Sequence, residues 1–201
     1  MTVLIATRNR HKLEEIRQIF AVPSLKLVAA DEIPGLPDDV VEDADTFEGN
    51  ALKKARVLCA ASGLWTLADD SGLEVEALGN APGVRSARYA GEPSNDAANN
   101  AKLLRDLTGV NDRRARFRCA IALCAPDGRE WIVEGRCEGQ IILEARGANG
   151  FGYDPLFVPH GHDKTFAELD RSVKNAISHR GRALRAAAGA WRTWLSQGPA
   201  K

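Results

Sequence analysis

Hydrophobic positions along the chain follow two periods, and each change of period marks a predicted boundary between a strand and a helix. Short apolar or β-branched runs predict strands over 2–7, 25–29, 65–67 and 73–77. Repeats of three and four residues predict helices after Asn9, over 46–62, between Ser94 and Gly109, and over 180–196. The chain therefore begins with a strand, a tight turn and a helix.

The clearest antiparallel hairpin lies in the second half of the chain. Residues 114–124 alternate between apolar and polar side chains, and residues 131–140 return as a second strand after a Pro-Asp-Gly turn. The apolar side of the first strand holds Phe117, Cys119, Ile121 and Leu123. Arg116 and Arg118 lie on the opposite side.

Polar residues and glycines predict where the helices begin and end. Asn9 is a suitable N-cap, Asp45 with Glu48 resembles a capping box, and Gly63 ends that helix. Ser94 predicts the start of the next helix. Its apolar face is expected to hold Ala97, Ala101, Leu104 and Leu107.

The last predicted helix has apolar residues at core spacing, namely Leu184, Ala187, Trp191 and Leu195. This spacing favours packing of Trp191 in the core over stacking on a ligand.

Composition narrows the class of protein. The 201 residues are enough for one domain, or one domain with two lobes, and 44% are hydrophobic and 27% charged. Twenty-seven basic residues balance 27 acidic ones, which argues against bulk nucleic-acid or membrane-surface binding. No signal-like segment or long apolar run is present, so we expect a cytoplasmic enzyme or binding protein.

Four cysteines form no C-x-x-C pair, which favours free, partly buried thiols over zinc ligands or disulfides. Residues 160–163, His-Gly-His-Asp, offer an alternative metal site, although exposed histidines in a glycine loop are the simpler interpretation.

Two adjacent carboxylates, Asp69 and Asp70, follow the apolar run 65–67 and precede Ser71 and Gly72. We expect the strand to end there, because Asp, Ser and Gly favour turns. Neighbouring strand side chains face opposite ways, so only one of the two carboxylates can face a ligand. At the carboxyl end of a strand, such a group suits Mg²⁺ on a phosphate. A plain turn is the alternative.

The first helical turn is basic, with Arg8, Arg10, His11 and Lys12 near its start. A helix N-terminus favours acidic side chains, so this charge is unfavourable unless an anion binds there. A solvated basic surface is the alternative.

Four polar groups together indicate a nucleoside triphosphate site, because they supply cations, carboxylates and a flat apolar surface. They are the basic turn, Asp70 with the acidic loop near Glu42, residues 151–154, and the set Lys174, His179 and Arg180. No G-x-x-x-x-G-K-[ST] loop is present, which argues against P-loop chemistry.

Seven motifs, in order from residue 6 to about 184, resemble the inosine/xanthosine triphosphate pyrophosphatase family, the Ham1-like house-cleaning enzymes. They are Ala6-Thr7-x-Asn9-x-x-Lys12, Phe47-x-x-Asn50-Ala51-x-x-Lys54-Ala55, Ala68-Asp-Asp-Ser-Gly-Leu73, Ser86-Ala-Arg-Tyr89, Gly150-Phe-Gly-Tyr-Asp-Pro155, Phe166-Ala-Glu-Leu169 and Lys174-Asn-Ala-Ile-Ser-His-Arg180. No single motif is decisive, but the ordered set is highly specific.

The resemblance implies a mixed α/β fold: a strongly twisted sheet with flanking helices, and two lobes around a nucleotide cleft. It also implies a homodimer, and Mg²⁺-dependent hydrolysis of ITP, dITP or XTP to the monophosphate and pyrophosphate. Carried over by position, Glu42 and Asp70 would hold Mg²⁺, and Asp70 would activate the attacking water. The triphosphate would bind Thr7, Arg8, Asn9, Arg10, His11 and Lys12, with Lys54 as a further contact.

The base and phosphates would also contact Ser71, Phe151, Gly152, Tyr153, Asp154, Lys174, His179 and Arg180. A lysine, arginine or backbone donor would favour a 6-oxo purine over adenine. This chain departs from the family near residues 8 and 11, where glycine is common and this sequence has Arg8 and His11, so the phosphate turn lacks the flexibility of glycine.

Three other functions remain open. A nucleotide-binding sensor would bind without turnover, and a general triphosphate hydrolase would not select the base. A nucleic-acid-binding module would use Arg114, Arg116 and Arg118, although the zero net charge weighs against it.

Overall fold

The computed structural model describes residues 1–22 and 25–191. Their contacts divide the chain into two units. Unit 1 contains residues 1–70, 119–135 and those from 180 onward, and unit 2 contains residues 71–118 and 136–179. The chain therefore passes from one unit to the other within three strands, after Asp70, after Arg118 and after Gly135, and again at the start of the last helix, after His179.

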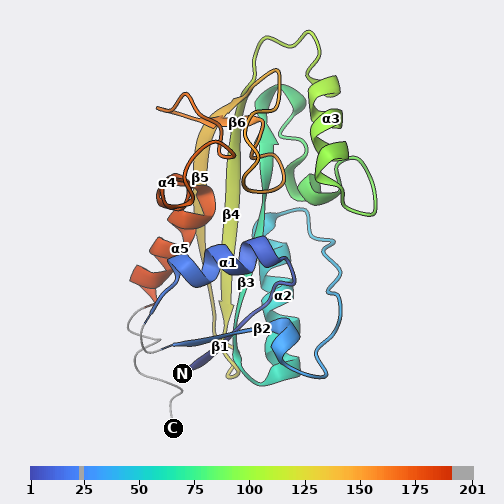
Figure 1. The fold of residues 1–201 in the computed structure, drawn as a ribbon. Helices are drawn as coiled ribbons and strands as arrows, with labels where there is room; N and C mark the ends of the chain where they lie inside the picture. Colours follow the sequence, from blue (N-terminus) through green and yellow to red (C-terminus); the bar gives the residue numbers. More distant parts are fainter. Residues whose placement is uncertain (23–24, 192–201) are drawn as a thin grey trace. The chain divides into compact units, whose positions relative to one another are not determined.

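Helices and strands alternate in the first part of the chain, and a hairpin follows (Figure 1). The strands are β1 Thr2–Ile5, β2 Lys26–Ala29, β3 Trp65–Val75, β4 Arg114–Cys124, β5 Glu130–Ile141 and β6 Phe157–Pro159. The α-helices are α1 Arg10–Ile19, α2 Phe47–Ser62, α3 Asp96–Asp106, α4 Arg171–Ile177 and α5 His179–Ala190. Short 3-10 helices are η1 Ala30–Glu32, η2 Glu76–Leu78 and η3 Gly83–Arg88.

The six strands form one sheet in the order β2-β1-β3-β4-β5-β6. Strand β1 runs parallel to both β2 and β3, and Leu4 lies opposite Val28 on one side and Thr66 on the other. Strand β6 pairs antiparallel with the end of β5, so the sheet is mixed, as the resemblance implied. The hairpin prediction is also confirmed, because β4 and β5 are neighbours joined by a turn at residues 125–129.

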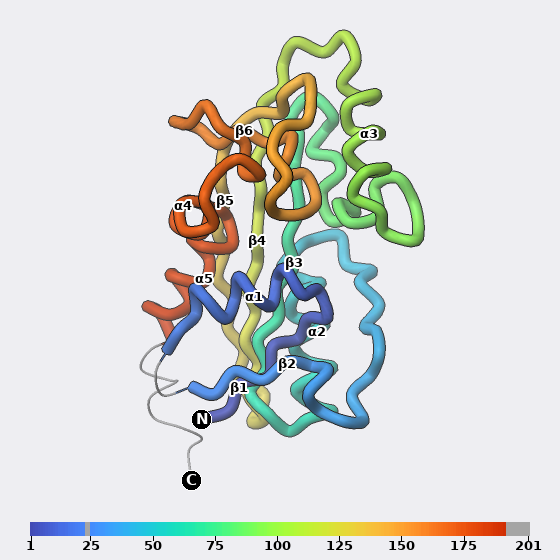
Figure 2. The backbone as a smooth tube through the Cα atoms, in the orientation of Figure 1, coloured from blue at the N-terminus to red at the C-terminus, as the bar shows by residue number. Residues whose placement is uncertain are grey.

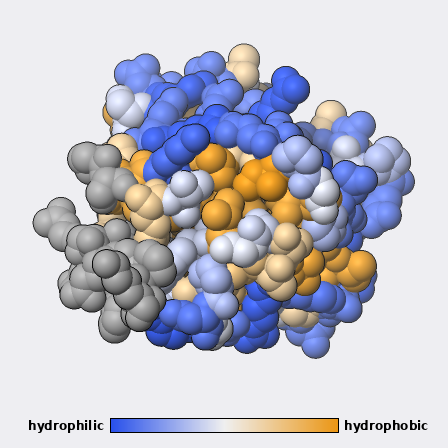
Figure 3. Space-filling view, turned by 90° about the horizontal axis from the view of Figure 1, so that it is seen from below, coloured by the Kyte–Doolittle hydropathy of each residue, from blue (hydrophilic) through white to orange (hydrophobic). Residues whose placement is uncertain are grey.

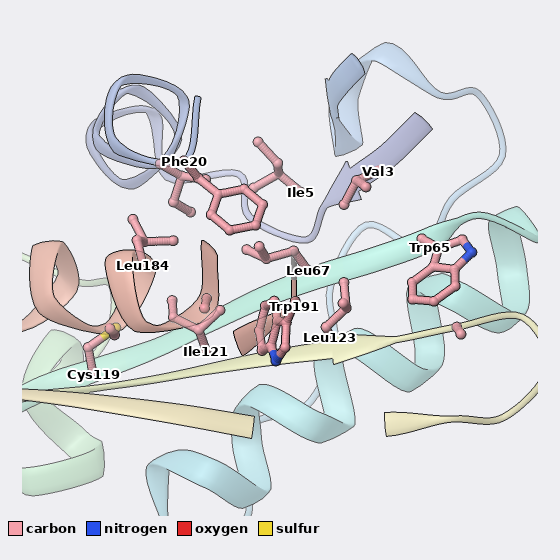
Figure 4. Packing of buried hydrophobic residues seen from close by; sticks show 14 residues of the cluster. Val3, Ile5, Phe20, Trp65, Leu67, Cys119, Ile121, Leu123, Leu184 and Trp191 are labelled. Atoms are coloured by element: carbon pink, nitrogen blue, oxygen red, sulfur yellow. The ribbon is translucent and has the colours of Figure 1, made fainter. Parts of the chain in front are cut away.

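The core of unit 1 lies between the sheet and two helices (Figure 4). Ile5 of β1, Leu67 of β3 and Ile121 of β4 are each at most 1% exposed, and Leu184 of α5 packs in the same cluster. Trp191 is 2% exposed, and its ring meets Phe20 edge-on at 6.4 Å. The prediction that Trp191 packs in the core is therefore confirmed.

Unit 2 has a second core built around three phenylalanines. The Phe117 ring lies 4.8 Å from Phe157 at 68° and 5.9 Å from Phe166 at 24°. Leu73 and Leu103, both fully buried, belong to the same cluster. Tyr153 belongs to this core and anchors the segment around residue 151 there. The path of the segment can be followed in Figure 2.

Strand β3 corrects the prediction that the strand ends at residue 67, because it continues unbroken to Val75. The turn expected around Asp69 and Asp70 is therefore wrong, as is a separate strand over 73–77. These carboxylates are 1% and 6% exposed, and cationic side chains in the fold pair with them. Local propensity for a turn is overridden by these long-range partners.

The caps of α2 are partly as predicted. Gly63 ends the helix with φ +66°, which favours glycine. The N-cap is Thr46, whose hydroxyl accepts a hydrogen bond from the Gly49 N–H, so the prediction of Asp45 at this position is wrong. Asn9 caps α1 as predicted, and its side chain accepts from the Lys12 N–H at 3.1 Å.

Helix α3 differs from its prediction at both its start and its buried face. Asn95 is the N-cap, with its side chain accepting from the Ala98 N–H, while Ser94 bonds elsewhere. Leu107 is buried and Leu104 is partly buried against the core, as predicted, whereas Ala97 and Ala101 are exposed and Leu103 is buried instead. The two alanines were misassigned because alanine spacing alone cannot separate a buried face from a solvent face.

The last helix begins at His179 and is described to Ala190. Its predicted end at Ser196, and the predicted core position Leu195, lie outside the described residues. The short helix α4 before it was not predicted, and Lys174 lies within it.

The cysteine prediction is confirmed: Cys59, Cys119, Cys124 and Cys137 are all free and buried. No helix in the described ranges is long and apolar enough to span a membrane. The described large apolar residues with more than a third of their surface exposed are Val41, Val57, Ile132 and Leu143. Figure 3 shows one face, on which an apolar area is bordered by hydrophilic residues.

Truncating the tryptophan that closes the unit 1 core tests this packing. We expect Trp191→Ala to lower the free energy of unfolding by about 3–5 kcal/mol, because it removes a large buried ring and leaves a cavity. Urea denaturation measures this loss. Leu143→Ala is the control, because this side chain is 74% exposed, and its effect should stay within about 0.5 kcal/mol. Equal effects of the two changes would contradict the assignment.

Candidate active site

Asp69 and Asp70 are adjacent on β3 and have different partners, as expected from the alternation of strand side chains. Asp69 pairs with Lys12 of α1 at 2.5 Å and with Arg180 of α5 at 2.9 Å. Asp70 pairs with Lys54 of α2 at 3.3 Å. All five side chains belong to unit 1.

Asp69 is the centre of a buried ionic network. The Cys119 thiol donates to its Oδ2 at 2.9 Å, and Arg180 also reaches Glu15 at 2.5 Å. Burial alone would raise the pKa of Asp69, but the charges of Arg180 and Lys12 outweigh burial and hold it well below the ordinary value. Asp69 is therefore an anion at neutral pH that fixes Lys12 and Arg180.

Asp70 has the opposite electrostatic character. Burial raises its pKa to about 6, with Glu42 and Asp69 adding to the effect and Lys54 and Lys12 opposing it. Its Oδ2 atom is buried and accepts no hydrogen bond from any described residue. Such an oxygen is available to a proton, a water or a cation.

Lys54 bridges Asp70 and Glu42, the two residues predicted to hold a metal. Its Nζ lies 3.1 Å from Glu42 and 3.3 Å from Asp70. Asn50, one turn earlier on α2, holds the acidic loop by accepting from the Ala44 N–H and donating to the Ala44 carbonyl. This places Glu42 beside α2. Of the two neighbouring lysines, only Lys54 faces this cluster, because Lys53 pairs with Asp43.

The carboxylate pair is a small metal-ligand set. Within the described part of the chain, no group of three or more His, Cys, Asp or Glu side chains is placed to hold a metal. His160, His162 and Asp163, the alternative metal site considered from the sequence, are among the described residues and form no such group. Mg²⁺ in proteins commonly takes one or two carboxylates and completes its shell with water and substrate phosphates. Glu42 and Asp70, with the unpaired Asp70 oxygen, fit this pattern.

The basic turn before α1 is partly paired. Arg8 contacts Asp38 at 3.3 Å and the Pro37 carbonyl at 3.0 Å. Thr7 is half-buried, and Arg10 and His11 are exposed. The first turn of α1 contains no acidic residue, as the sequence suggested. Phosphate binding by these residues and by Asn9 stays a prediction.

A second set of predicted residues lies together in unit 2, around Asp154. Its Oδ2 accepts from the Lys174 Nζ at 2.6 Å and from the Phe151 N–H at 3.0 Å. Lys174 and Asp154 are 5% and 3% exposed. Gly150 has φ +77°, and a Cβ there would overlap Asp154 Oδ2, so glycine is favoured at this position.

The half-buried Phe151 ring lies close to this ion pair, with the Lys174 Nζ 5.1 Å from its centroid. Tyr153 is 3% exposed and donates its hydroxyl to the Ser86 carbonyl at 2.8 Å, which gives it a structural role. His179 stacks on Phe117 at 4.7 Å. Ser71 is half-buried on β3.

Sequence reasoning turned one of the two aspartates away from the ligand, but it missed the partners of Asp69 and the role of Glu15. Glu15 follows Lys12 by one helical turn, which is a signal that both side chains share a face of α1. Arg180 was expected to contact the substrate, but its guanidinium is 1% exposed and held by two carboxylates. This position favours a positioning role, and direct contact with the base stays a prediction.

The arginines of β4 give no support to a nucleic-acid interface. Arg116 and Arg118 both pair with Glu74, at 2.6 and 3.3 Å. Arg114 pairs with Glu76 and Asp112, at 2.9 and 2.7 Å. Each positive charge therefore already has a carboxylate partner.

The Asp69 network predicts a pH-dependent stability. Because the pKa of Asp69 is lowered on folding, its anion adds stability above the unfolded pKa of about 3.9. That stability is lost as the pH falls through the lower folded value. Asp69→Asn should therefore cost about 3–5 kcal/mol at pH 7, since it leaves buried cations unpaired. The difference from the unmodified protein should shrink below about pH 4.

Urea denaturation at a series of pH values from about 3 to about 7 measures how the free energy of unfolding depends on pH. The matched control is Asp127→Asn, because Asp127 is 48% exposed and its ion pair with Arg129 is at the surface. Its cost at neutral pH should be much smaller than that of Asp69→Asn, because exposed ion pairs add little to stability. A destabilisation by Asp69→Asn that did not vary with pH would contradict the ionised state.

Comparison with known proteins places this chain among close relatives. A dITP/XTP pyrophosphatase of Desulforamulus reducens is 51% identical over 189 residues, covering 93% of this chain and 94% of the relative. One from Geobacter sulfurreducens is 51% identical over 184 residues, covering 90% and 92%.

Solved structures of Ham1 proteins are also similar to this chain. A HAM1 protein from Coxiella burnetii has a TM-score of 0.88 and 42% identity, covering 96% of this chain and 99% of that one. The Staphylococcus aureus Ham1 protein has a TM-score of 0.87 and 40% identity, covering 96% and 100%. The model of the Ham1 family matches residues 3–190. The resemblance drawn from the seven motifs is thus confirmed, and the chain belongs to the Ham1 family.

Proposed function

We propose that this protein hydrolyses deaminated purine nucleoside triphosphates, ITP, dITP or XTP, to the monophosphate and pyrophosphate, and so removes them from the nucleotide pool. The observation that carries the proposal is the buried Asp70 with one unpaired oxygen, beside Lys54 and Glu42. It occurs in a chain about half identical to proteins named dITP/XTP pyrophosphatases.

Glu42 and Asp70 would hold Mg²⁺ in this proposal. When bound, the ion would neutralise phosphate oxygens and lower the cost of charge that builds up at the reacting phosphorus. The support is the donor set: two oxygen ligands, which suit a hard cation, and a buried oxygen that lacks a protein partner.

Asp70 would also serve as the general base. A carboxylate whose pKa is about 6 is ionised at neutral pH and still basic enough to accept a proton. The water oxygen would attack the α-phosphorus while its proton passes to Asp70. The bond between the α-phosphorus and the bridging oxygen would break, and pyrophosphate would leave.

Lys12 and Lys54 would balance the phosphate charge. Both ammonium groups are mostly buried, with side chains 15% and 11% exposed, so their fields are weakly screened. Each is held by a carboxylate of β3. The exposed residues around the start of α1, from Arg8 to His11, would contribute further phosphate contacts.

Phe151 and Lys174 would supply base recognition. The Phe151 ring offers a stacking surface, and Lys174, held by Asp154, offers a donor for a 6-oxo group. An adenine amine against the same donor would leave both groups unpaired, at a cost of about 1–3 kcal/mol. Ser71, Gly152, Tyr153, His179 and Arg180 complete the predicted set.

We also infer that the protein is a cytoplasmic homodimer that acts on free nucleotides rather than on nucleic acid. The family resemblance supports the dimer, and the four free thiols suit a reducing compartment. A sensor without turnover and a hydrolase that ignores the base are the rival functions. The acidic cluster around Asp70 favours chemistry over mere binding.

Removing the charge of Asp70 tests the proposed base. Asp70→Asn should lower kcat at least about 100-fold, the usual range for loss of a general base. Glu42→Gln should raise the Mg²⁺ concentration needed for half-maximal rate. Pyrophosphate release measures both, and thermal denaturation checks that each variant is folded. Asp39→Asn, in the same acidic loop but exposed, is the control and should be unchanged. A near-normal rate in Asp70→Asn at saturating Mg²⁺ would remove Asp70 from the mechanism.

A substrate panel tests the base selectivity. We expect kcat/KM for ITP or XTP to exceed that for ATP by at least about 100-fold, as when a wrong base leaves buried polar groups unpaired. Pyrophosphate release from normal and deaminated triphosphates at one enzyme concentration gives the ratio. Comparable rates for ATP and ITP would favour the general hydrolase, and binding without release would favour the sensor.

A further inference from the structure

Helix α3 holds both polar groups of one glycine in the segment around Phe151. The Gly152 N–H donates to Asp96 Oδ2 at 2.7 Å, and the Gly152 carbonyl accepts from Asn100 Nδ2 at 2.9 Å. Asp96 and Asn100 are four residues apart and therefore share one face of the helix. Figure 2 shows the orange segment that contains Gly152 beside the green helix α3.

The acidic residue has a simple structural explanation on its own. Asp96 is the first residue of α3, where the helix dipole favours a negative charge, and it is exposed. On this explanation alone, the contact of Asp96 with Gly152 would be incidental. The helix dipole does not explain Asn100, which is uncharged and lies one turn further along α3.

Asn100 is a costly choice for its position. Asparagine is a poor residue in the interior of a helix. Its Oδ1 is buried and has no hydrogen-bond partner among the described residues, which is unfavourable because the oxygen loses its contact with water. The side chain gains one contact in return, the donation to the Gly152 carbonyl. This exchange is understandable if the position of Gly152 matters for more than folding.

The two hydrogen bonds that join Asp96 and Asn100 to Gly152, here called the clamp, act where the backbone has little stiffness of its own. Gly150 and Gly152, on either side of Phe151, both have positive φ, and glycine has the widest choice of backbone conformations. Tyr153 is fixed through its bond to Ser86, and Asp154 through its bond to Lys174. Without Asp96 and Asn100, Gly152 would lose both of its hydrogen bonds to α3.

We propose that Asp96 and Asn100 are positioning residues that fix the Gly152 peptide, and through it the Phe151 ring, in the conformation that receives the purine base. The inference rests on the proposed function, since it assumes that Phe151 stacks on the base. It goes further by assigning α3 a part in substrate binding. A pre-ordered loop binds more tightly, because its ordering entropy is not lost again on binding.

Four variants and a control test the clamp kinetically. Asp96→Ala and Asn100→Ala should each raise KM for ITP about tenfold with kcat within about twofold, because the loop orders only on binding. Asp96→Asn keeps an acceptor oxygen for the Gly152 N–H and should be near normal. Asn100→Asp replaces the donor with a repelling oxygen and should be at least as impaired as Asn100→Ala. Arg105→Ala, exposed on the same helix, should have no effect.

The conservative variant separates the clamp from a helix-dipole effect. If the charge of Asp96 mattered only for α3, Asp96→Asn would be as harmful as Asp96→Ala, and this result would overturn the proposal. Equal falls in kcat and kcat/KM for the alanine variants would also overturn it, since they would show loss of the chemical step rather than of pre-ordering.

Amide hydrogen exchange without nucleotide gives a readout that does not depend on turnover. The Gly152 and Tyr153 amides should exchange at least about fivefold faster in Asp96→Ala and Asn100→Ala, with Asp96→Asn and Arg105→Ala unchanged. Unchanged exchange in the alanine variants would overturn the clamp. If the unmodified protein released no pyrophosphate from any triphosphate, the proposed function would fail, and with it the substrate role of α3. The exchange data would still show whether the clamp itself exists.

Discussion

The buried pairing of Asp69 with Arg180 and Lys12 is the interaction on which unit 1 depends. Two carboxylates, Asp69 and Glu15, face two cations, so the network is neutral as a whole although each member is charged. Removing water from such groups is costly unless every charge has a partner. The set ties β3 to α1 and α5, and the apolar cluster around Leu67 and Leu184 packs on the same elements. The strand can therefore stay regular through a pair of aspartates.

The strand also gives two identical side chains different chemistry. Asp69 has its cations fixed and remains an anion, whereas Asp70 shares Lys54 with Glu42 and titrates near neutrality. Because consecutive residues face opposite sides of a strand, a single dipeptide supplies one carboxylate held as an anion and one carboxylate with a raised pKa and an oxygen without a protein partner. Around Asp154 in unit 2 the arrangement is different, because a single carboxylate orders both a lysine and a glycine loop.

Much of the fold follows from local pattern. The first helix, the hairpin of β4 and β5, the stop at Gly63 and the core position of Trp191 were all predictable, because each depends on periodicity or on one cap. The continuation of β3 was not, since its polar centre is stabilised by Arg180, 111 positions away in the sequence. The caps of α2 and α3 were misplaced by one residue where several cap-forming residues occur in a row. For the site, the motifs named Asp70 and Lys54, which the fold brings together with Glu42. Only the fold shows that Arg180 binds carboxylates and that Asn100 holds Gly152.

The burial of all four thiols has a practical consequence for work on this protein. Cys59, Cys119, Cys124 and Cys137 are each 6% exposed or less, and burial raises the pKa of Cys124 to about 12. Maleimide and iodoacetamide reagents attack accessible thiolates, so the native chain should remain almost unlabelled at neutral pH. A cysteine introduced at an exposed site, such as Arg105→Cys on α3, would then carry a fluorophore or spin label selectively. Spectroscopy on this protein can therefore begin from the natural sequence, with no need to replace its cysteines first.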